Sequence, residues 1–153
     1  MKKPFLLVVF LLTLMGLASG QELVVKTYVE KTHMSPKTGT AIGFENQYQW
    51  EYGAFFQETS LVESFMMSEA DKAALPRHYE KEFYGLYFAV PVMLREQFVV
   101  KANVRTGVSN GENFVITPSL LADYKLAEHI RVGMGLGSRA FRPTLQGSLS
   151  FVF

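Results

Sequence analysis

Hydrophobic and polar residues alternate with a period of two through the C-terminal half of the chain, from Phe83 to Phe153. No competing helical period of 3.6 appears there, so we expect two-faced β-strands in this half. The connections between them are tight or rich in turn residues, which predicts an up-and-down antiparallel meander. The expected strands cover residues 84–94, 98–108, 114–126, 130–140 and 145–153.

The N-terminal half alternates less regularly. Residues 23–31 form a weaker strand candidate. Residues 41–57 keep one parity throughout and are predicted as one long strand, with two short strands joined near Gln49 as the alternative. The alternation stops between Thr59 and Glu82, where the pattern predicts a long loop carrying a short helix at 69–75.

Alternation alone does not say which face of a barrel meets water. The polar face of residues 131–139 combines arginines with glycines, which suits a crowded barrel interior. The strands are roughly 10 to 13 residues long, close to what a tilted strand needs to cross the hydrocarbon of a membrane. Aromatic residues of the apolar face gather at strand ends, as in membrane barrels: Tyr84 and Phe114 at one level, and Phe98, Tyr124 and Phe153 at the other. The pattern favours an all-β, antiparallel transmembrane barrel over a soluble one.

The first 20 residues have the pattern of a secretory signal peptide. Two leader lysines precede the apolar run Phe5–Leu14, and small residues follow at Ala18 and Gly20. The apolar run is too short for a membrane-spanning helix. We therefore expect cleavage near Gly20, with residues 21–153 forming one barrel domain.

Composition narrows the classes of function. The absence of cysteine excludes disulfides, thiolate catalysis, cysteine zinc sites and lipid attachment at a cysteine. The 15 basic and 14 acidic residues nearly balance, so the chain lacks the excess of positive charge that is typical of nucleic-acid-binding proteins. With 48% hydrophobic and 14% aromatic residues, the chain is not of the disordered class.

No motif of the sequence points to catalysis or to a cofactor. His33, His78 and His129 lack metal-ligand spacing, and no Gly-x-Ser-x-Gly motif or phosphate-binding loop occurs. The glycine run of residues 133–137 lies on an expected strand and indicates small interior side chains. We expect neither an enzyme nor a metal or cofactor site.

Charged residues on the polar face are the candidate site inside the barrel. An interior of about eight strands is only wide enough for its own side chains, so these groups must pair or carry water. The expected network comprises Glu45, Glu51, Lys101, Arg105, Asp123, Lys125, Arg131 and Arg139. A salt-bridged plug is the favoured interpretation and an ion-conducting lumen the alternative.

The last residues, Leu145-x-Gly147-x-Leu149-x-Phe151-x-Phe153, resemble the C-terminal strand by which barrel proteins are handed to the outer-membrane insertion machinery. The chain is similar to the small OmpA/OmpX-like outer-membrane barrels. This resemblance implies a location in the cell outer membrane, surrounded by its lipid, with Leu149, Phe151 and Phe153 as the insertion signal. Because bacterial single-chain barrels use an even number of strands, we expect eight, one more than the alternation resolves.

Three hypotheses about function follow. The first is a structural or accessory membrane barrel that contacts another membrane or surface protein through the 59–82 loop, where Phe65, Met66 and Met67 form a candidate partner surface. Ordinary packing over the barrel mouth is the other interpretation of these residues. The second hypothesis is a narrow outer-membrane channel, and the third is a soluble periplasmic barrel that binds an apolar ligand inside.

Overall fold

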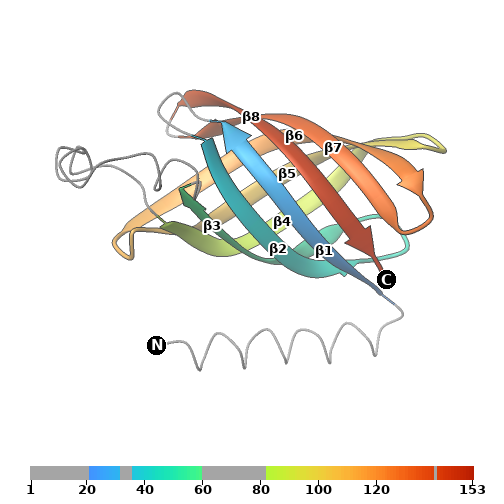
Figure 1. The fold of residues 1–153 in the computed structure, drawn as a ribbon, viewed down its shortest axis with the longest axis horizontal. Coiled ribbons are helices and arrows are strands. Elements are labelled where there is room, and N and C mark those ends of the chain that lie inside the picture. The colour runs from blue at the N-terminus through green and yellow to red at the C-terminus, as the bar shows by residue number, and fades with distance from the viewer. Residues whose placement is uncertain (1–20, 32–35, 60–81, 140) are drawn as a thin grey trace.

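The computed structural model describes residues 21–31, 36–59, 82–139 and 141–153. They form one closed barrel in which every strand pairs antiparallel with its neighbours along the chain, and the last strand closes on the first (Figure 1). The strands are β1 Glu22–Lys31, β2 Pro36–Glu45, β3 Glu51–Thr59, β4 Glu82–Leu94, β5 Phe98–Ser109, β6 Asn113–Ala127, β7 Ile130–Arg139 and β8 Arg142–Val152. The eight-stranded, up-and-down barrel predicted from the sequence is confirmed.

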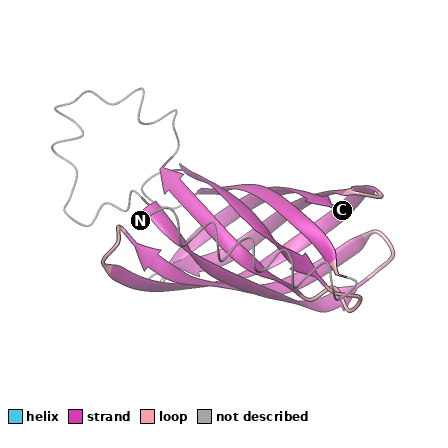
Figure 2. Ribbon diagram, turned by 90° about the horizontal axis from the view of Figure 1, so that it is seen from below, coloured by secondary structure: helices cyan, strands magenta, loops and turns pink. Residues whose placement is uncertain are grey.

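The strands cross the barrel at a tilt, and turns connect them at both ends (Figure 2). One end, here called the turn end, carries the connections at 46–50, 95–97 and 128–129. The other, here called the loop end, is where β3 finishes, β4 begins and the β5–β6 turn lies. In the described ranges no helix is long and apolar enough to cross a membrane. The expected signal peptide and the expected helix at 69–75 lie outside the described residues.

The prediction of one long strand over residues 41–57 is wrong, and the alternative of two strands is correct. A turn at 46–50 separates β2 from β3. The Asn46 side-chain oxygen accepts hydrogen bonds from the backbone N–H groups of Tyr48 and Trp50, both at 3.0 Å. Glu45 pairs with Glu51, so an odd-numbered residue of β2 lies opposite an odd-numbered residue of β3. The same parity therefore points inward on both strands, and the alternation of the sequence continues through the turn without a break.

Pro36 and Pro143 lie at the starts of β2 and β8, whereas Pro91 and Pro118 lie further inside β4 and β6, where a proline removes one ladder hydrogen bond. Pro91 adjoins an irregularity in the β4–β5 register, between Pro91 and Met93. Pro118 pairs with Val104 of β5, while the β6–β7 ladder begins only at Ser119. Pro91 and Pro118 therefore lie where the ladder is already irregular or incomplete.

Candidate functional site in the barrel interior

Alternate residues of every strand point inward, and much of the interior they fill is charged or polar. On β1, Lys26 and Glu30 are buried, while Thr27 and Val29 on the opposite face are exposed. Burying an unpaired charge is costly, so the inward charges must find partners within the barrel. In the described part of the chain, most of these charges form two groups of ion pairs, one toward each end.

The turn-end cluster is built around Glu45, the last residue of β2, and Glu51, the first of β3. Lys101 of β5 donates to both carboxylates and is fully buried. Lys26 of β1 binds Glu51 at 2.9 Å, and Arg131 of β7 binds Glu45 in a bidentate pair at 2.7 and 2.8 Å. Two acidic and three basic side chains from five strands are thereby joined across the lumen.

The loop-end cluster is centred on Glu30, whose side chain is fully buried. Arg105 donates to Glu30 at 2.7 Å, and the Gln57 amide nitrogen donates to the same oxygen at 2.9 Å. Arg139 lies 3.8 Å from Glu30 and also donates to the Gln57 oxygen. Side chains from β1, β3, β5 and β7 therefore meet at one carboxylate.

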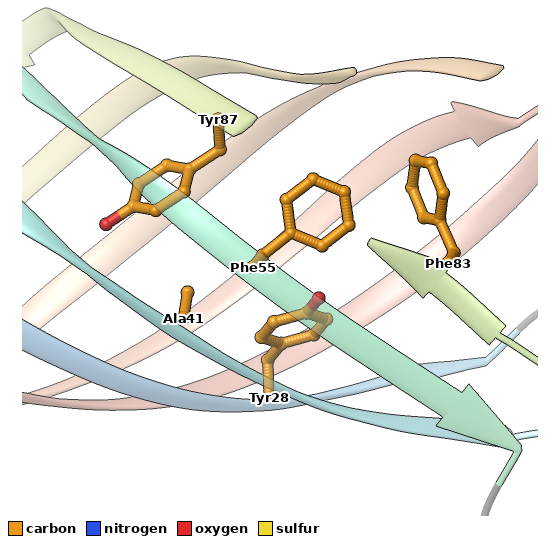
Figure 3. Close-up of a cluster of buried hydrophobic side chains, with 5 residues drawn as sticks. All are labelled: Tyr28, Ala41, Phe55, Phe83 and Tyr87. Carbon is orange, nitrogen blue, oxygen red and sulfur yellow. The ribbon is translucent and has the colours of Figure 1, made fainter. Parts of the chain in front are cut away.

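A group of buried aromatic rings packs against charged residues of both clusters. Figure 3 shows these rings, Tyr28, Phe55, Phe83 and Tyr87, together with Ala41. The rings of Phe55 and Phe83 meet edge to face with centroids 4.7 Å apart. The Arg139 guanidinium lies 4.1 Å from the centre of Phe83, and the Arg105 guanidinium 5.0 Å from that of Tyr28. Cations packed on ring faces gain electrostatic stabilisation in addition to their ion pairs.

Glycines make room for the interior tyrosines. A β-carbon added at Gly39 would lie 2.4 Å from the ring of Tyr28. One added at Gly53 would lie 2.8 Å from the ring of Tyr87, and closer still to the β2 backbone. Both tyrosines thus occupy space that a side chain on β2 or β3 would fill.

The wall formed by β6, β7 and β8 differs from the rest of the interior because its side chains are small. Gly133, Gly135 and Gly137 line β7, and Asp123 packs over Gly133. Six buried side chains on β6 and β8 each have a polar atom without a protein partner: Thr117, Asp123, Thr144, Gln146, Ser148 and Ser150. Such a polar wall is suited to ordered water.

The structure places most of the charged residues singled out in the sequence inside the barrel. Glu45, Glu51, Lys101 and Arg131 meet in the turn-end cluster, and Arg105 and Arg139 in the loop-end cluster. Asp123 is buried but lies apart on the small-residue wall. Lys125 is exposed near the end of β6 and joins neither cluster.

Sequence reasoning missed Lys26 and Glu30 as network members, together with the interior aromatic rings. The signal was the parity of residues 23–31, where both charges fall opposite Leu23, Val25 and Val29. The aromatic rings carried no such signal. Phe55 and Tyr87 have the parity of the polar, inward face, but their side chains are of the type expected on the apolar, outward face.

The expected insertion signal lies on the last strand, β8, and on the residue that follows it. Leu149 and Phe151 are on its outer face, and Phe153 exchanges backbone hydrogen bonds with Leu23 at the turn end. Phe65, Met66 and Met67 lie outside the described residues. Among the residues that the structure describes, no group of three acidic or histidine side chains could hold a metal ion. The ring of His129 contacts the backbone carbonyl of Val152 instead.

No family model matches the chain, and no curated protein matches its sequence. Solved structures do share the fold. A computationally designed transmembrane β-barrel matches with a TM-score of 0.66 at 7% identity, over 86% of this chain and 95% of the design. A second design, TMB2.3, matches with a TM-score of 0.63 at 9% identity, over 86% and 93%.

Ail, the attachment invasion locus protein of Yersinia pestis, matches with a TM-score of 0.40 at 9% identity, over 87% of this chain and 97% of Ail. The two designed barrels show that this chain shares the barrel fold of designed transmembrane proteins.

Proposed function

We propose that this chain is an integral outer-membrane β-barrel protein with a structural or accessory role, exercised through the 59–82 loop toward another membrane or surface protein. Its interior is a salt-bridged plug rather than a catalytic site. The insertion machinery of the outer membrane recognises Leu149, Phe151 and Phe153, and outer-membrane lipid surrounds the strands.

One observation carries this proposal: the polarity of the barrel is inverted relative to a soluble protein. Buried ion pairs, aromatic rings and small polar side chains fill the inside, while large apolar side chains cover the outside. Leu136 and Met134 on β7, for example, are 67% and 65% exposed. An apolar outer surface of this extent favours hydrocarbon as its surroundings. The charged interior argues against a soluble barrel that binds an apolar ligand.

Aromatic side chains at the two ends support the same placement. At the turn end, Trp50 packs edge to face on Phe88 with centroids 5.9 Å apart. Tyr124, near the end of β6, and Phe153, just after β8, are also exposed at this end of the barrel. Phe114 lies at the loop end. Amphipathic rings at both ends suit the two headgroup levels of a bilayer.

The orientation follows from the proposed insertion signal. If Phe153 ends at the periplasmic side, the turn end is periplasmic and the loop end faces outward. The 59–82 loop then projects from the cell, in keeping with the longer outer loops of such barrels.

Cysteine labelling tests this function, since the chain has no native cysteine. Lys72→Cys should react with an impermeant maleimide on intact cells, and Glu96→Cys only after the outer membrane is opened. The protein should also remain with the membrane after a carbonate wash. Release by carbonate would refute membrane integration, and the reverse labelling pattern would refute the orientation and the external role of the loop.

The small-residue wall of β6–β8 favours a second candidate, a narrow channel. Its unpartnered hydroxyl and amide groups follow the lumen from Thr144 to Ser150. Single-channel recording in planar bilayers distinguishes the two functions: a plug gives no unitary conductance steps, and a channel gives steps that Gly135→Leu abolishes.

A further inference from the structure

The first residue of the barrel domain is a glutamine. Cleavage of the leader after Gly20, the position expected from its small residues, makes Gln21 the amino terminus of the mature chain. β1 begins at Glu22, so this cleavage leaves one residue ahead of the first strand. Leu23 exchanges backbone hydrogen bonds with Phe153, and the start of β1 therefore lies beside the chain end at the turn end of the barrel (Figure 1).

The side chain of Gln21 is held by a residue of β3. Its carbonyl oxygen, Oε1, accepts a hydrogen bond from the hydroxyl of Tyr52 at 2.6 Å. Tyr52 pairs with Phe44 of β2, and the two rings pack with their centroids 6.3 Å apart. Because Phe44 is buried, the ring of Tyr52 rests on a fixed neighbour. The hydroxyl therefore reaches Gln21 from a defined position in the barrel wall.

We infer that Gln21 is a modification site, at which the mature chain closes its amino terminus into a pyroglutamate ring with the help of Tyr52. The inference goes beyond the proposed function and rests on the expected cleavage. Near neutral pH a fraction of α-amino groups is unprotonated and able to attack a carbonyl carbon. The α-amino nitrogen attacks Cδ of its own side chain and forms the ring amide bond. The bond from Cδ to the side-chain nitrogen breaks, and that nitrogen leaves as ammonia with the proton given up by the α-amine.

The hydrogen bond from Tyr52 favours this step. Attack on Cδ turns the carbonyl oxygen into an oxyanion, and a donor already aimed at that oxygen stabilises the developing charge. The same oxygen becomes the ring carbonyl of the product. The reaction thus keeps the atom that Tyr52 contacts and removes the nitrogen, which takes no part in that hydrogen bond.

The competing fate of the terminus is a free ammonium group that pairs with the terminal carboxylate of Phe153, which lies opposite Leu23. A salt bridge at an exposed site is weak and forms reversibly. Ring closure is irreversible in practice, because the ammonia diffuses away. The ion pair therefore slows cyclisation without preventing it.

The first test is intact-mass and tandem mass spectrometry of the protein purified from cells that export it. The mature chain should begin at residue 21 and lack the mass of one ammonia, and the loss should map to Gln21. Gln21→Met, which cannot close the ring, should keep a free α-amine. A mature wild type that begins at Gln21 with its amide intact would overturn the inference, and so would a different first residue.

The second test measures the rate of ring closure in vitro and isolates the role of Tyr52. A chain whose leader can be removed by a protease directly before Gln21 is folded in detergent and cleaved, and the loss of ammonia is followed by mass against time. The wild type should cyclise several-fold faster than Tyr52→Phe, which keeps the ring but lacks the donor. The matched control is Tyr48→Phe, in the β2–β3 turn, which should behave as the wild type.

Equal rates for the wild type and Tyr52→Phe would overturn the inference. Equal rates for the folded and the urea-unfolded wild type would do so as well, because the hydrogen bond exists only in the folded barrel. These outcomes are distinct from failure of the proposed function, which carbonate extraction and cysteine labelling decide independently of the chemistry at the amino terminus.

Discussion

Lys101 is the residue on which the turn-end cluster depends most, because it donates to Glu45 and Glu51 from a fully buried position. Removing one member of a buried ion pair typically costs about 3–5 kcal/mol, since the remaining charge stays desolvated. Lys101→Met should lower the free energy of unfolding by about 3 kcal/mol, the low end of that range, because Arg131 and Lys26 still partner the two carboxylates. Urea unfolding in detergent measures this value.

The matched control is Lys125→Met, because Lys125 is exposed near the end of β6. Its effect should stay within about 0.5 kcal/mol. Equal losses in the two variants would show that the buried cluster contributes no more than a surface charge.

Gly39 provides a second test at the scale of single residues. Gly39→Ala places a methyl group where the ring of Tyr28 lies, and such overpacking typically costs about 1–3 kcal/mol. In a Tyr28→Ala background the same substitution should cost far less, because the ring is gone. A double-mutant cycle of unfolding free energies measures the coupling, and additive effects would contradict the packing of Tyr28 on Gly39.

At the scale of elements, the β2–β3 turn depends on the side chain of Asn46. Asn46→Ala removes the acceptor of two backbone hydrogen bonds and should destabilise the barrel by about 1–2 kcal/mol, whereas Asn46→Asp keeps an acceptor and should be milder. Thermal unfolding of both variants beside Gln47→Ala measures the difference. If all three behave alike, the turn is not held by this side chain.

The outward face of β7 makes a separate prediction. Leu136→Arg should cost about 2–4 kcal/mol or block insertion if the residue lies near the bilayer midplane, because a charge would enter hydrocarbon. Ser148→Ala, which changes an inward side chain of β8, should be mild. The yield of each variant that folds into vesicles measures both effects. Similar yields for Leu136→Arg and Ser148→Ala would contradict the assignment of the outward and inward faces.

Period-two alternation predicted most elements of the barrel because each strand has one charged or small face and one apolar face. It failed at the β2–β3 turn for a geometric reason. The hairpin pairs residues of equal parity, so the pattern of residues 41–57 is the same for one strand or two. The clue was Asn46, a residue that favours turns through its own side chain.

The interior was less predictable than the strands. Parity places a residue inside but does not say which inward residues from distant strands meet, because that depends on the stagger of the closed sheet. Glu30 and Arg105 pair across the lumen although they are far apart in sequence. The aromatic rings escaped prediction because a polar face was expected to hold polar groups alone.

At the scale of the whole molecule, closure leaves no free sheet edge for detergent to attack. Purified protein should therefore migrate differently on gels before and after boiling, as the folded barrel resists detergent until heated. Identical mobility of heated and unheated samples would argue against a closed barrel in solution.

The β1–β8 ladder joins the two ends of the described chain, with Leu23 and Phe153 exchanging backbone hydrogen bonds. The first strand to be synthesised thus finds its second neighbour only when the last strand has been delivered. Until then β1 and the last strand of the growing sheet each carry a row of unpaired N–H and C=O groups, which hydrocarbon does not tolerate. Assembly in a bilayer must therefore keep both edges covered until the whole chain is present, and a chain arrested before β8 has no stable intermediate in the membrane.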